Sequence, residues 1–139
     1  MADVRPPSNA AQAIAATALR AEQARMRIIA ENIANANSTS RTPGGDPYRR
    51  QVPVFEPVRI EAGQGVKMVR VAPDQSEFKT EYDPGHPSAD AEGFVKMPNV
   101  NTLIESLDMK AAQRAYEANL TVIETARSME LRTLDLIRK

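Results

Sequence analysis

The chain has 139 residues, enough for one domain. Its 18 Lys and Arg balance its 18 Asp and Glu, which argues against the strong net positive field of nucleic-acid-binding and membrane-surface proteins. It contains no Cys, so disulfides and thiolate chemistry are excluded. No stretch is apolar for long enough to insert directly into a membrane, and the start lacks the apolar region of a Sec-type signal peptide. If the protein leaves the cytoplasm, we expect another export route.

Residues 1–9 contain two prolines and no periodic pattern, which predicts a flexible N-terminus. From Ala10 the segment AAQAIAATALRAEQARMRIIAENIANAN places apolar residues at steps of three and four, which predicts an Ala-rich helix. Ser8 or Asn9 can cap its start, and a left-handed Asn37 can cap its end. The side chains of Asn32 and Asn35 either belong to this helix ending or bind a neighbouring subunit.

Between residues 48 and 97 the period changes. YRRQVPVFEPVRI (48–60) alternates, but its prolines restrict it to an edge strand or an extended arm. Gly63-Gln64-Gly65 predicts a turn, and residues 66–72 and 77–83 predict short strands joined at 73–75. The middle of the chain is therefore predicted to be a small β meander, followed by a turn-rich segment up to Pro98.

The last segment, from Asn99 to Lys139, contains no Pro and no Gly and predicts one long helix of roughly 60 Å. Asn99 or Asn101 can cap its start. It has two apolar seams. One comprises Val100, Ile104, Leu107, Ala111, Ala115, Ala118, Val122 and Met129, and the other Met109, Ala112, Tyr116, Ile123 and Ala126. Two seams exceed what one partner helix covers, so we expect more than one helical neighbour.

The predicted fold is mainly α with a small β-rich middle lobe, and the two long terminal helices pair as a coiled coil. Residues 10–47 and 98–139 would form the terminal helical domain, and residues 48–97 the lobe. Because many seam residues are Ala, each contact buries little apolar area, and one pair of helices would be marginally stable. The helices therefore need further neighbours, either within the chain or in other copies.

The sequence offers little for catalysis. His86, with Asp83 and Asp90 nearby, could ligate a metal or act as a base, but the spacing matches no metal motif and Pro-Gly-His-Pro is typical of a turn. Gly63-Gln64-Gly65 lacks the third glycine of a dinucleotide fingerprint. We expect no cofactor, no metal site and no enzyme activity.

Three motifs resemble a known family. NIANANS (32–38) with YRRQ (48–51) and Val54-Phe55 is similar to the N-terminal motif of flagellar axial proteins. YDPGHP (82–87) with Ala89-Asp90, then GFVKMPNVN (93–101) and finally RAYEAN (114–119), resemble the FlgC family of flagellar basal-body rod proteins. The resemblance covers roughly residues 19–136. The polar start and the ending LIRK depart from the family pattern.

The resemblance implies a structural subunit of the proximal rod, assembled helically around the export channel in the periplasm and transmitting torque. It implies export by the flagellar type III apparatus without a cleaved signal peptide, and partners among its own copies and other rod proteins. The middle lobe would face outward. We expect the assembly interface to include Ile29, Ile33, Asn35, Asn37, Tyr48, Leu107, Arg114, Tyr116, Asn119, Ile123 and Met129.

A second hypothesis is a soluble helical-hairpin adapter that binds the helix of a partner in a groove. It differs from the rod subunit in one respect that can be measured. An adapter has stably folded terminal helices as a monomer, whereas a rod subunit needs its neighbours to order them.

Overall fold

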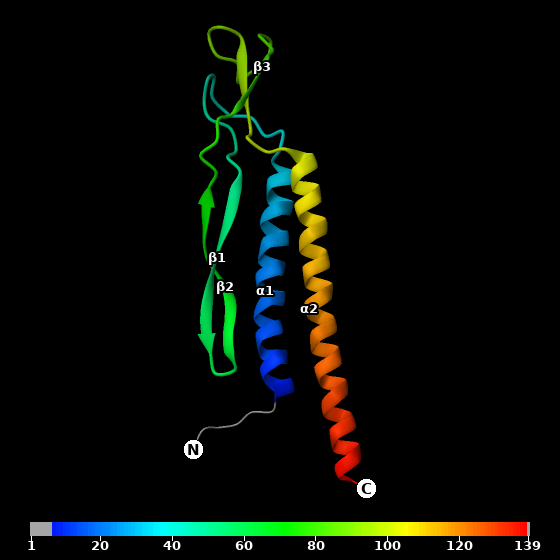
Figure 1. The fold of residues 1–139 in the computed structure, drawn as a ribbon. Helices are drawn as coiled ribbons and strands as arrows, with labels where there is room; N and C mark the ends of the chain where they lie inside the picture. The colour runs from blue at the N-terminus through cyan, green and yellow to red at the C-terminus, as the bar shows by residue number, and fades with distance from the viewer. Residues whose placement is uncertain (1–6, 139) are drawn as a thin grey trace. The chain divides into compact units, whose positions relative to one another are not determined.

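The computed structural model describes residues 7–138 of the chain. The elements are α1 (Pro7–Ala34), β1 (Gln51–Ile60), β2 (Gly63–Pro73), β3 (Lys79–Tyr82), β4 (Phe94–Met97) and α2 (Thr102–Ile137) (Figure 1). The predicted plan of two terminal helices with a small β region between them is confirmed. Most of the predicted flexible N-terminus, residues 1–6, lies outside the described residues.

The chain divides into two compact units. In the described range, the terminal unit consists of residues 7–26, 54–70 and 111–138, and the central unit of residues 27–53 and 71–110. Each helix and the β1–β2 hairpin therefore contribute to both units. The two units are described separately below.

Helix α1 begins at Pro7, three residues earlier than predicted. A proline is well suited to the first turn of a helix, where its missing N–H is not needed. Ser8 and Asn9 thus lie inside the helix, and the prediction that either caps it is wrong. Instead, the Ser8 hydroxyl donates to a carboxylate oxygen of Glu130 at 2.9 Å, which joins the start of α1 to α2 within the terminal unit.

The start of α2 and the end of α1 were also predicted to be capped by asparagines. Asn101 Oδ1 accepts from the backbone N–H groups of Leu103 and Ile104 at 3.1 and 3.4 Å, so its prediction as the cap of α2 is confirmed. Helix α1 ends at Ala34 and continues into a hydrogen-bonded turn over residues 35–37. Among the described residues only three glycines have positive φ, so the predicted left-handed cap at Asn37 is wrong.

The β region consists of two separate two-stranded sheets rather than a meander. Strand β1 pairs with β2, and β3 pairs antiparallel with β4. Strand β4 lies within the segment that the sequence predicts to be rich in turns. The register places Tyr82 opposite Phe94 and Lys79 opposite Met97. The strand predicted at 77–83 is present as β3, but the loop after Pro73 is bound by polar side chains, so β3 does not continue the first sheet.

The turn of the β1–β2 hairpin lies at Glu61 and Ala62, so the predicted turn at Gly63-Gln64-Gly65 is wrong by two residues. These glycines begin β2 for a different reason. A Cβ on Gly65 would lie 2.6 Å from Thr17 Oγ1, and that oxygen accepts from the backbone N–H of Val66 at 3.1 Å. Gly65 therefore permits the close approach of β2 to α1 in the terminal unit.

The two units are packed differently. The buried apolar residues of the terminal unit are alanines, namely Ala15, Ala21, Ala112 and Ala126. The central unit buries one alanine, Ala36, but also larger apolar side chains and polar ones, namely Ile28, Ile29, Val95, Val100, Asn32, Ser88 and Glu105. Alanine allows helices to approach closely but removes little apolar surface from water. Within residues 7–138, no helix is both long and apolar enough to cross a membrane.

Candidate functional site

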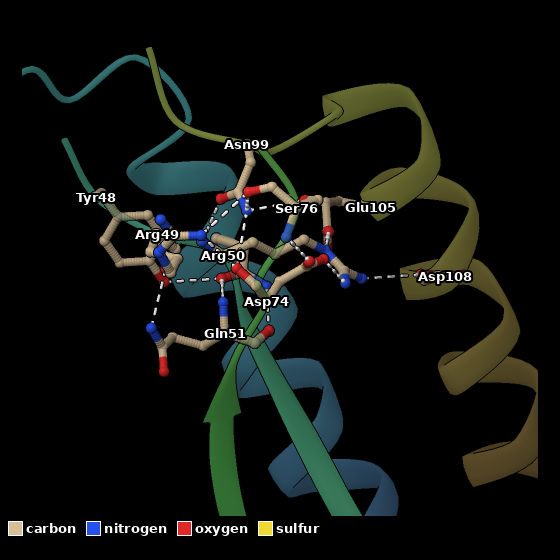
Figure 2. A network of polar contacts seen from close by, with 10 residues as sticks. Tyr48, Arg49, Arg50, Gln51, Asp74, Ser76, Asn99, Glu105 and Asp108 are labelled. Carbon is tan, nitrogen blue, oxygen red and sulfur yellow. Dashed lines mark hydrogen bonds and ion pairs between the residues drawn. The ribbon is translucent and has the colours of Figure 1, made fainter. Parts of the chain in front are cut away.

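A network of polar side chains occupies the central unit, where β1 begins and α2 begins (Figure 2). Its centre is Arg50, the residue before β1. The Nε atom of Arg50 donates to Glu105 Oε1, and one terminal nitrogen donates to Asp74 Oδ2 at 3.2 Å. The other terminal nitrogen lies 3.9 Å from Asp108 Oδ2. One guanidinium thus binds carboxylates of the first helical turns and of the loop after β2.

The loop after β2 is held by the neighbouring residues. Arg49 donates to the backbone carbonyls of Asp74 and Ser76 at 2.7 and 3.0 Å, and its guanidinium lies 4.2 Å from the ring centre of Phe78. Asn99 Nδ2 donates to the same two carbonyls, at 3.1 Å each, while its Oδ1 accepts from the backbone N–H of Arg50 at 2.7 Å. Asn99 therefore serves this network and does not cap α2.

A third part of the network joins the end of α1 to β1. The side chain of Asn32 is 1% exposed. Its Nδ2 donates to the backbone carbonyl of Gln51 at 2.9 Å, and its Oδ1 accepts from the backbone N–H of the same residue at 2.9 Å. The Tyr48 hydroxyl donates to the same Oδ1 at 2.7 Å. The side-chain amide of Asn32 thus pairs with both backbone groups of Gln51, as the backbone of a neighbouring strand would.

The charges in the network shift three pKa values. Burial raises the pKa of the Tyr48 hydroxyl, and the nearby carboxylates of Glu31 and Glu105 raise it further. Burial lowers the pKa of Arg50, but its bonds to Glu105 and Asp74 outweigh this effect and raise it overall. The backbone N–H of Ser76, its hydroxyl and then Arg50 hold the pKa of Asp74 below its usual value. Each shift favours the charge state that the network uses.

This arrangement joins elements of the central unit. The network carboxylates are held by Arg50, a backbone N–H or both, and the side chain of Glu105 is 1% exposed. His86, singled out with Asp83 and Asp90, accepts a backbone bond from Ser88 N at its Nδ1, 3.0 Å away. In the described part of the chain, no three His, Cys, Asp or Glu side chains gather in a way that could hold a metal ion.

The two apolar seams predicted on α2 have different surroundings. The inner seam comprises Met109, Ala112, Tyr116, Ile123 and Ala126. The outer seam comprises Ile104, Leu107, Ala111, Ala115, Ala118, Val122 and Met129, whereas Val100 lies before α2 and is buried. The inner seam is buried or half-buried, with Ala112 at 0% and Ala126 at 5% exposure. The outer seam is largely exposed along the helix, including Ile104 at 51%, Leu107 at 58% and Met129 at 59%. The chain itself therefore covers the inner seam and leaves most of the outer seam open.

Near its end, the outer seam borders a groove within the terminal unit. The groove has a volume of about 360 Å³ and is lined by Ser8 and Ala11 of α1 and by Thr121, Val122, Thr125, Ala126 and Met129 of α2. Its lining is mostly apolar. Beyond it, Leu131, Leu134, Leu136 and Ile137 are all more than half exposed. The last turns of α2 thus present apolar side chains on several sides.

The residues predicted for the assembly interface fall into three groups. Ile29 is buried in the central unit, and Ile33, Asn35, Tyr48, Tyr116, Asn119 and Ile123 are half-buried. Asn37, Leu107, Arg114 and Met129 are exposed. Asn35, in the turn after α1, donates from Nδ2 to the Glu31 carbonyl, and Asn119 donates from Nδ2 to the Ala115 carbonyl of its own helix. Among the predicted residues, only Asn37, Leu107, Arg114 and Met129 are therefore largely open to solvent.

Sequence reasoning missed the network itself. One residue in the sequence could have indicated it. Glu105 lies four residues before Met109 and therefore places a charged side chain on the helix face of the inner seam. A charged residue on a buried helix face needs a partner of opposite charge. The pair Arg49-Arg50 at the start of a strand could have supplied it, but the sequence does not indicate which arginine turns toward the helix.

The sequence matches two flagellar families. Residues 13–41 match the family described as "Flagella basal body rod protein", and residues 91–136 match "Flagellar basal body rod FlgEFG protein C-terminal". These two ranges contain most of α1 and α2.

Similar proteins extend the match to the middle of the chain. The flagellar basal-body rod protein FlgC of Agrobacterium fabrum is 48% identical over 134 residues, covering 95% of this chain and 96% of that protein. FlgC of Borreliella burgdorferi is 44% identical, covering 84% and 88%, and FlgC of Bacillus subtilis is 33% identical, covering 88% and 93%. With this identity over nearly the whole of each chain, the protein belongs to the FlgC family of flagellar basal-body rod proteins.

Proposed function

We propose that this protein is a structural subunit of the flagellar basal-body rod that joins its neighbours through the outer seam of α2. In this proposal the terminal helices of several copies, and of other rod proteins, pair as coiled coils around the export channel. The subunit passes torque through packing and has no catalytic role. Export through the type III apparatus without a cleaved signal peptide, and assembly in the periplasm, belong to the same proposal.

The observation that carries the proposal is the exposed outer seam. Leu107 and Met129 are each more than half exposed, although both belong to a regular apolar pattern on one helix. A large apolar stripe in water is unfavourable and is typical of a surface that another protein covers. The alanines between these residues let a second helix come close. A neighbouring helix of the rod fits both features.

The terminal unit supports the same view energetically. Its buried apolar residues are alanines, so its helices gain little from packing within one subunit. Contacts with neighbours would add the missing apolar burial. A contact between two different surfaces, repeated by a fixed rotation and rise, gives a helical tube rather than a closed dimer. We therefore expect the terminal helices to become fully ordered only in the assembly.

The test replaces Leu107 by Asp in the full-length protein, expressed in cells that lack the native copy. The matched control is Gln113→Asp, which adds the same charge at an exposed polar position of α2. We expect the Leu107 variant to be produced and exported but absent from purified basal bodies, with loss of motility. The control should assemble. Normal motility of the Leu107 variant would refute the outer seam as the interface.

Amide hydrogen exchange on the dilute protein separates the rod subunit from the helical adapter. A rod subunit should exchange rapidly over residues 7–26 and 111–138 and slowly in the central unit. Strong protection of both terminal segments in a monomer would favour the adapter, because its helices need no neighbour.

A further inference from the structure

Ser88 joins two loops of the central unit, the loop after α1 (residues 38–46) and the β3–β4 loop (residues 83–93). Ser88 lies in the β3–β4 loop and is 5% exposed. Its hydroxyl donates to the backbone carbonyl of Ser40, and its own carbonyl accepts from the backbone N–H of Gly44 at 3.1 Å. The position of Ser88 therefore determines how the loop after α1 lies against the β3–β4 loop.

The backbone N–H of Ser88 donates to Nδ1 of His86 at 3.0 Å. An imidazole nitrogen accepts a hydrogen bond only when it carries no proton, so this bond requires a neutral ring with its proton on Nε2. The backbone of His86 is held as well. Its N–H donates to the Asp83 carbonyl at 3.1 Å, and its carbonyl accepts from the N–H of Ala89 at 3.0 Å. The ring nitrogen thus accepts from Ser88 within an ordered turn.

A side chain that accepts from the backbone N–H two residues later occurs at other turns of the described chain, and there the acceptor is an oxygen. These pairs are Asp74 with Ser76 and Asp90 with Glu92, both at 2.9 Å, Ser40 with Thr42 at 3.0 Å, and Asn101 with Leu103 at 3.1 Å. Such oxygens remain acceptors near neutral pH, whereas histidine ordinarily takes up a proton between about pH 5 and 8. Position 86 therefore uses an acceptor that mild acidification removes.

The charged and titratable groups around His86 come from four segments. They are Asp83, Asp90 and Glu92 on its own loop, Arg41 and Asp46 on the loop after α1, Lys79, Glu81 and Tyr82 on β3, and Lys96 on β4. Within residues 7–138, none of them forms an ion pair with His86. Asp90 Oδ1 accepts from the backbone of Glu92 and Phe94, and Asp46 pairs with Lys96. No cation therefore replaces the bond to Ser88 as the reason for a neutral ring.

We propose that His86 is a pH switch that holds the loop after α1 against the β3–β4 loop at neutral pH and releases it on acidification. A proton on Nδ1 occupies the lone pair that accepts from Ser88, so that two donors face each other and the bond is lost. The backbone of Ser88 then turns away, and its bonds to Ser40 and Gly44 weaken. The contact is present above the pH at which the ring takes up its proton and is lost as the pH falls through it.

The switch acts on the connection between α1 and β1 and leaves the polar network around Arg50 in place. The other side-chain bond between the loop after α1 and the β3–β4 region is the pair of Asp46 and Lys96, whose side chains are 69% and 42% exposed. Exposed ion pairs of this kind hold a loop only weakly. The inference does not depend on the proposed function, because the switch lies within one copy of the chain.

Amide hydrogen exchange of the purified full-length protein at about pH 7.5 and about pH 5.5 tests the switch. Each rate is divided by the intrinsic rate at the same pH, which gives a protection factor. We expect the protection of the Ser88 and Gly44 amides to fall about tenfold at the lower pH. The Gln51 amide, which donates to Asn32, is the internal control and should keep its protection. Nitrogen NMR of the ring should place the proton on Nε2 at the higher pH.

The decisive variant is His86→Asn. The Oδ1 atom of an asparagine takes the place of Nδ1 and accepts from the same N–H, but it does not titrate in this range. Ser88 and Gly44 should therefore stay protected at both pH values in this variant. In His86→Ala, which has no acceptor, both amides should be poorly protected at both pH values. If the alanine variant does not fold, the comparison of wild type with His86→Asn still decides.

Several results would overturn the proposal. One is equal protection of Ser88 at both pH values in the wild type, and another is a proton on Nδ1 at the higher pH. The same loss of protection in His86→Asn as in the wild type would assign the effect to a carboxylate such as Asp83. A parallel loss at Gln51 would show that the whole central unit opens, and full protection in His86→Ala would show that the bond to Ser88 is not needed.

Discussion

The Nε atom of Arg50 donates to Glu105, whose side chain is 1% exposed and whose second oxygen, Oε2, has no hydrogen-bond partner among the described residues. The negative charge of Glu105 is therefore compensated mainly by Arg50. Removing one member of a buried ion pair is costly because the other charge stays behind, whereas replacing both by apolar groups is often tolerated. This pair thus fixes the first turn of α2 to the start of β1.

Arg50→Met should destabilise the central unit by about 3–5 kcal/mol, since Glu105 then lacks its cation. The double change Arg50→Met with Glu105→Leu should recover most of this loss. Urea unfolding of the full-length protein measures the stability of both variants. Amide hydrogen exchange in residues 71–110 shows whether the change falls in the central unit. Equal stability of the single and double variants would show that Glu105 is not the reason for the loss.

Asn32→Asp should destabilise the same unit by more than about 2 kcal/mol. The carboxylate can still accept from Gln51 N but faces the Gln51 carbonyl without a donor, in a position that is 1% exposed. Asn35→Asp is the matched control, because Asn35 is half-buried in the turn after α1 and its side chain bonds only to nearby residues, donating to the Glu31 carbonyl and accepting from the Ser38 hydroxyl. Thermal unfolding of the two variants should separate them clearly, and similar melting temperatures would contradict this role of Asn32.

The pKa of Asp74 predicts a dependence of stability on pH. Its folded pKa lies below its usual value of 3.8, so the carboxylate stabilises the fold at pH values above the unfolded pKa. This contribution is lost as the pH falls below about 4 and through the lowered folded pKa. Asp74→Asn should therefore cost about 1 kcal/mol at pH 7 and much less at pH 3.

Urea titrations of the wild type and the Asp74→Asn variant at several pH values measure this difference. Asp46→Asn serves as a control for loss of an exposed ion pair, since Asp46 and Lys96 have side chains that are 69% and 42% exposed. Its effect should be small at pH 7. If the difference in unfolding free energy between wild type and the Asp74 variant stays constant from pH 7 to pH 3, the lowered pKa of Asp74 is not its cause.

Gly93→Ala should destabilise the β3–β4 sheet by ~1–3 kcal/mol, because φ is +90° and the added Cβ approaches Tyr82 and Pro84. Gly85→Ala is the comparison. Its Cβ would meet only Asp83 Oδ1, at an ordinary distance of 3.8 Å. Amide exchange of residues 79–97 should speed up in the first variant and stay unchanged in the second. The reverse order would refute the account of Gly93.

The helices could be predicted from the sequence because their apolar spacing continues over many turns. The spacing predicted both apolar seams of α2, and Asn101 was correctly predicted as the N-terminal cap of this helix. The spacing alone could not indicate which seam the subunit covers, since both consist of similar apolar residues. That choice depends on tertiary partners such as Arg50, which binds the helix at Glu105 on the side of the inner seam.

The β region was harder to predict, because pairing between distant strands leaves no local signal. Strand β4 consists of Phe94–Met97 in a segment rich in Gly and Pro, and only its pairing with β3 makes it a strand. The glycines at 63 and 65 were assigned to a turn, although the role of Gly65 is to admit Thr17 of α1. The polar network was missed for the same reason, since its hydrogen-bonded residues lie up to 55 positions apart in the sequence, as Arg50 and Glu105 do.

The bond between Asn32 and Gln51 also affects how the protein avoids unwanted association. A two-stranded hairpin has two open edges, and each can add a strand from another molecule. Asn32 occupies both backbone groups of Gln51, and Thr17 occupies the N–H of Val66. Helix α1 thus blocks strand addition at these residues of β1 and β2. A chain that is concentrated at its site of assembly can then associate through side-chain surfaces without its hairpins aggregating edge to edge.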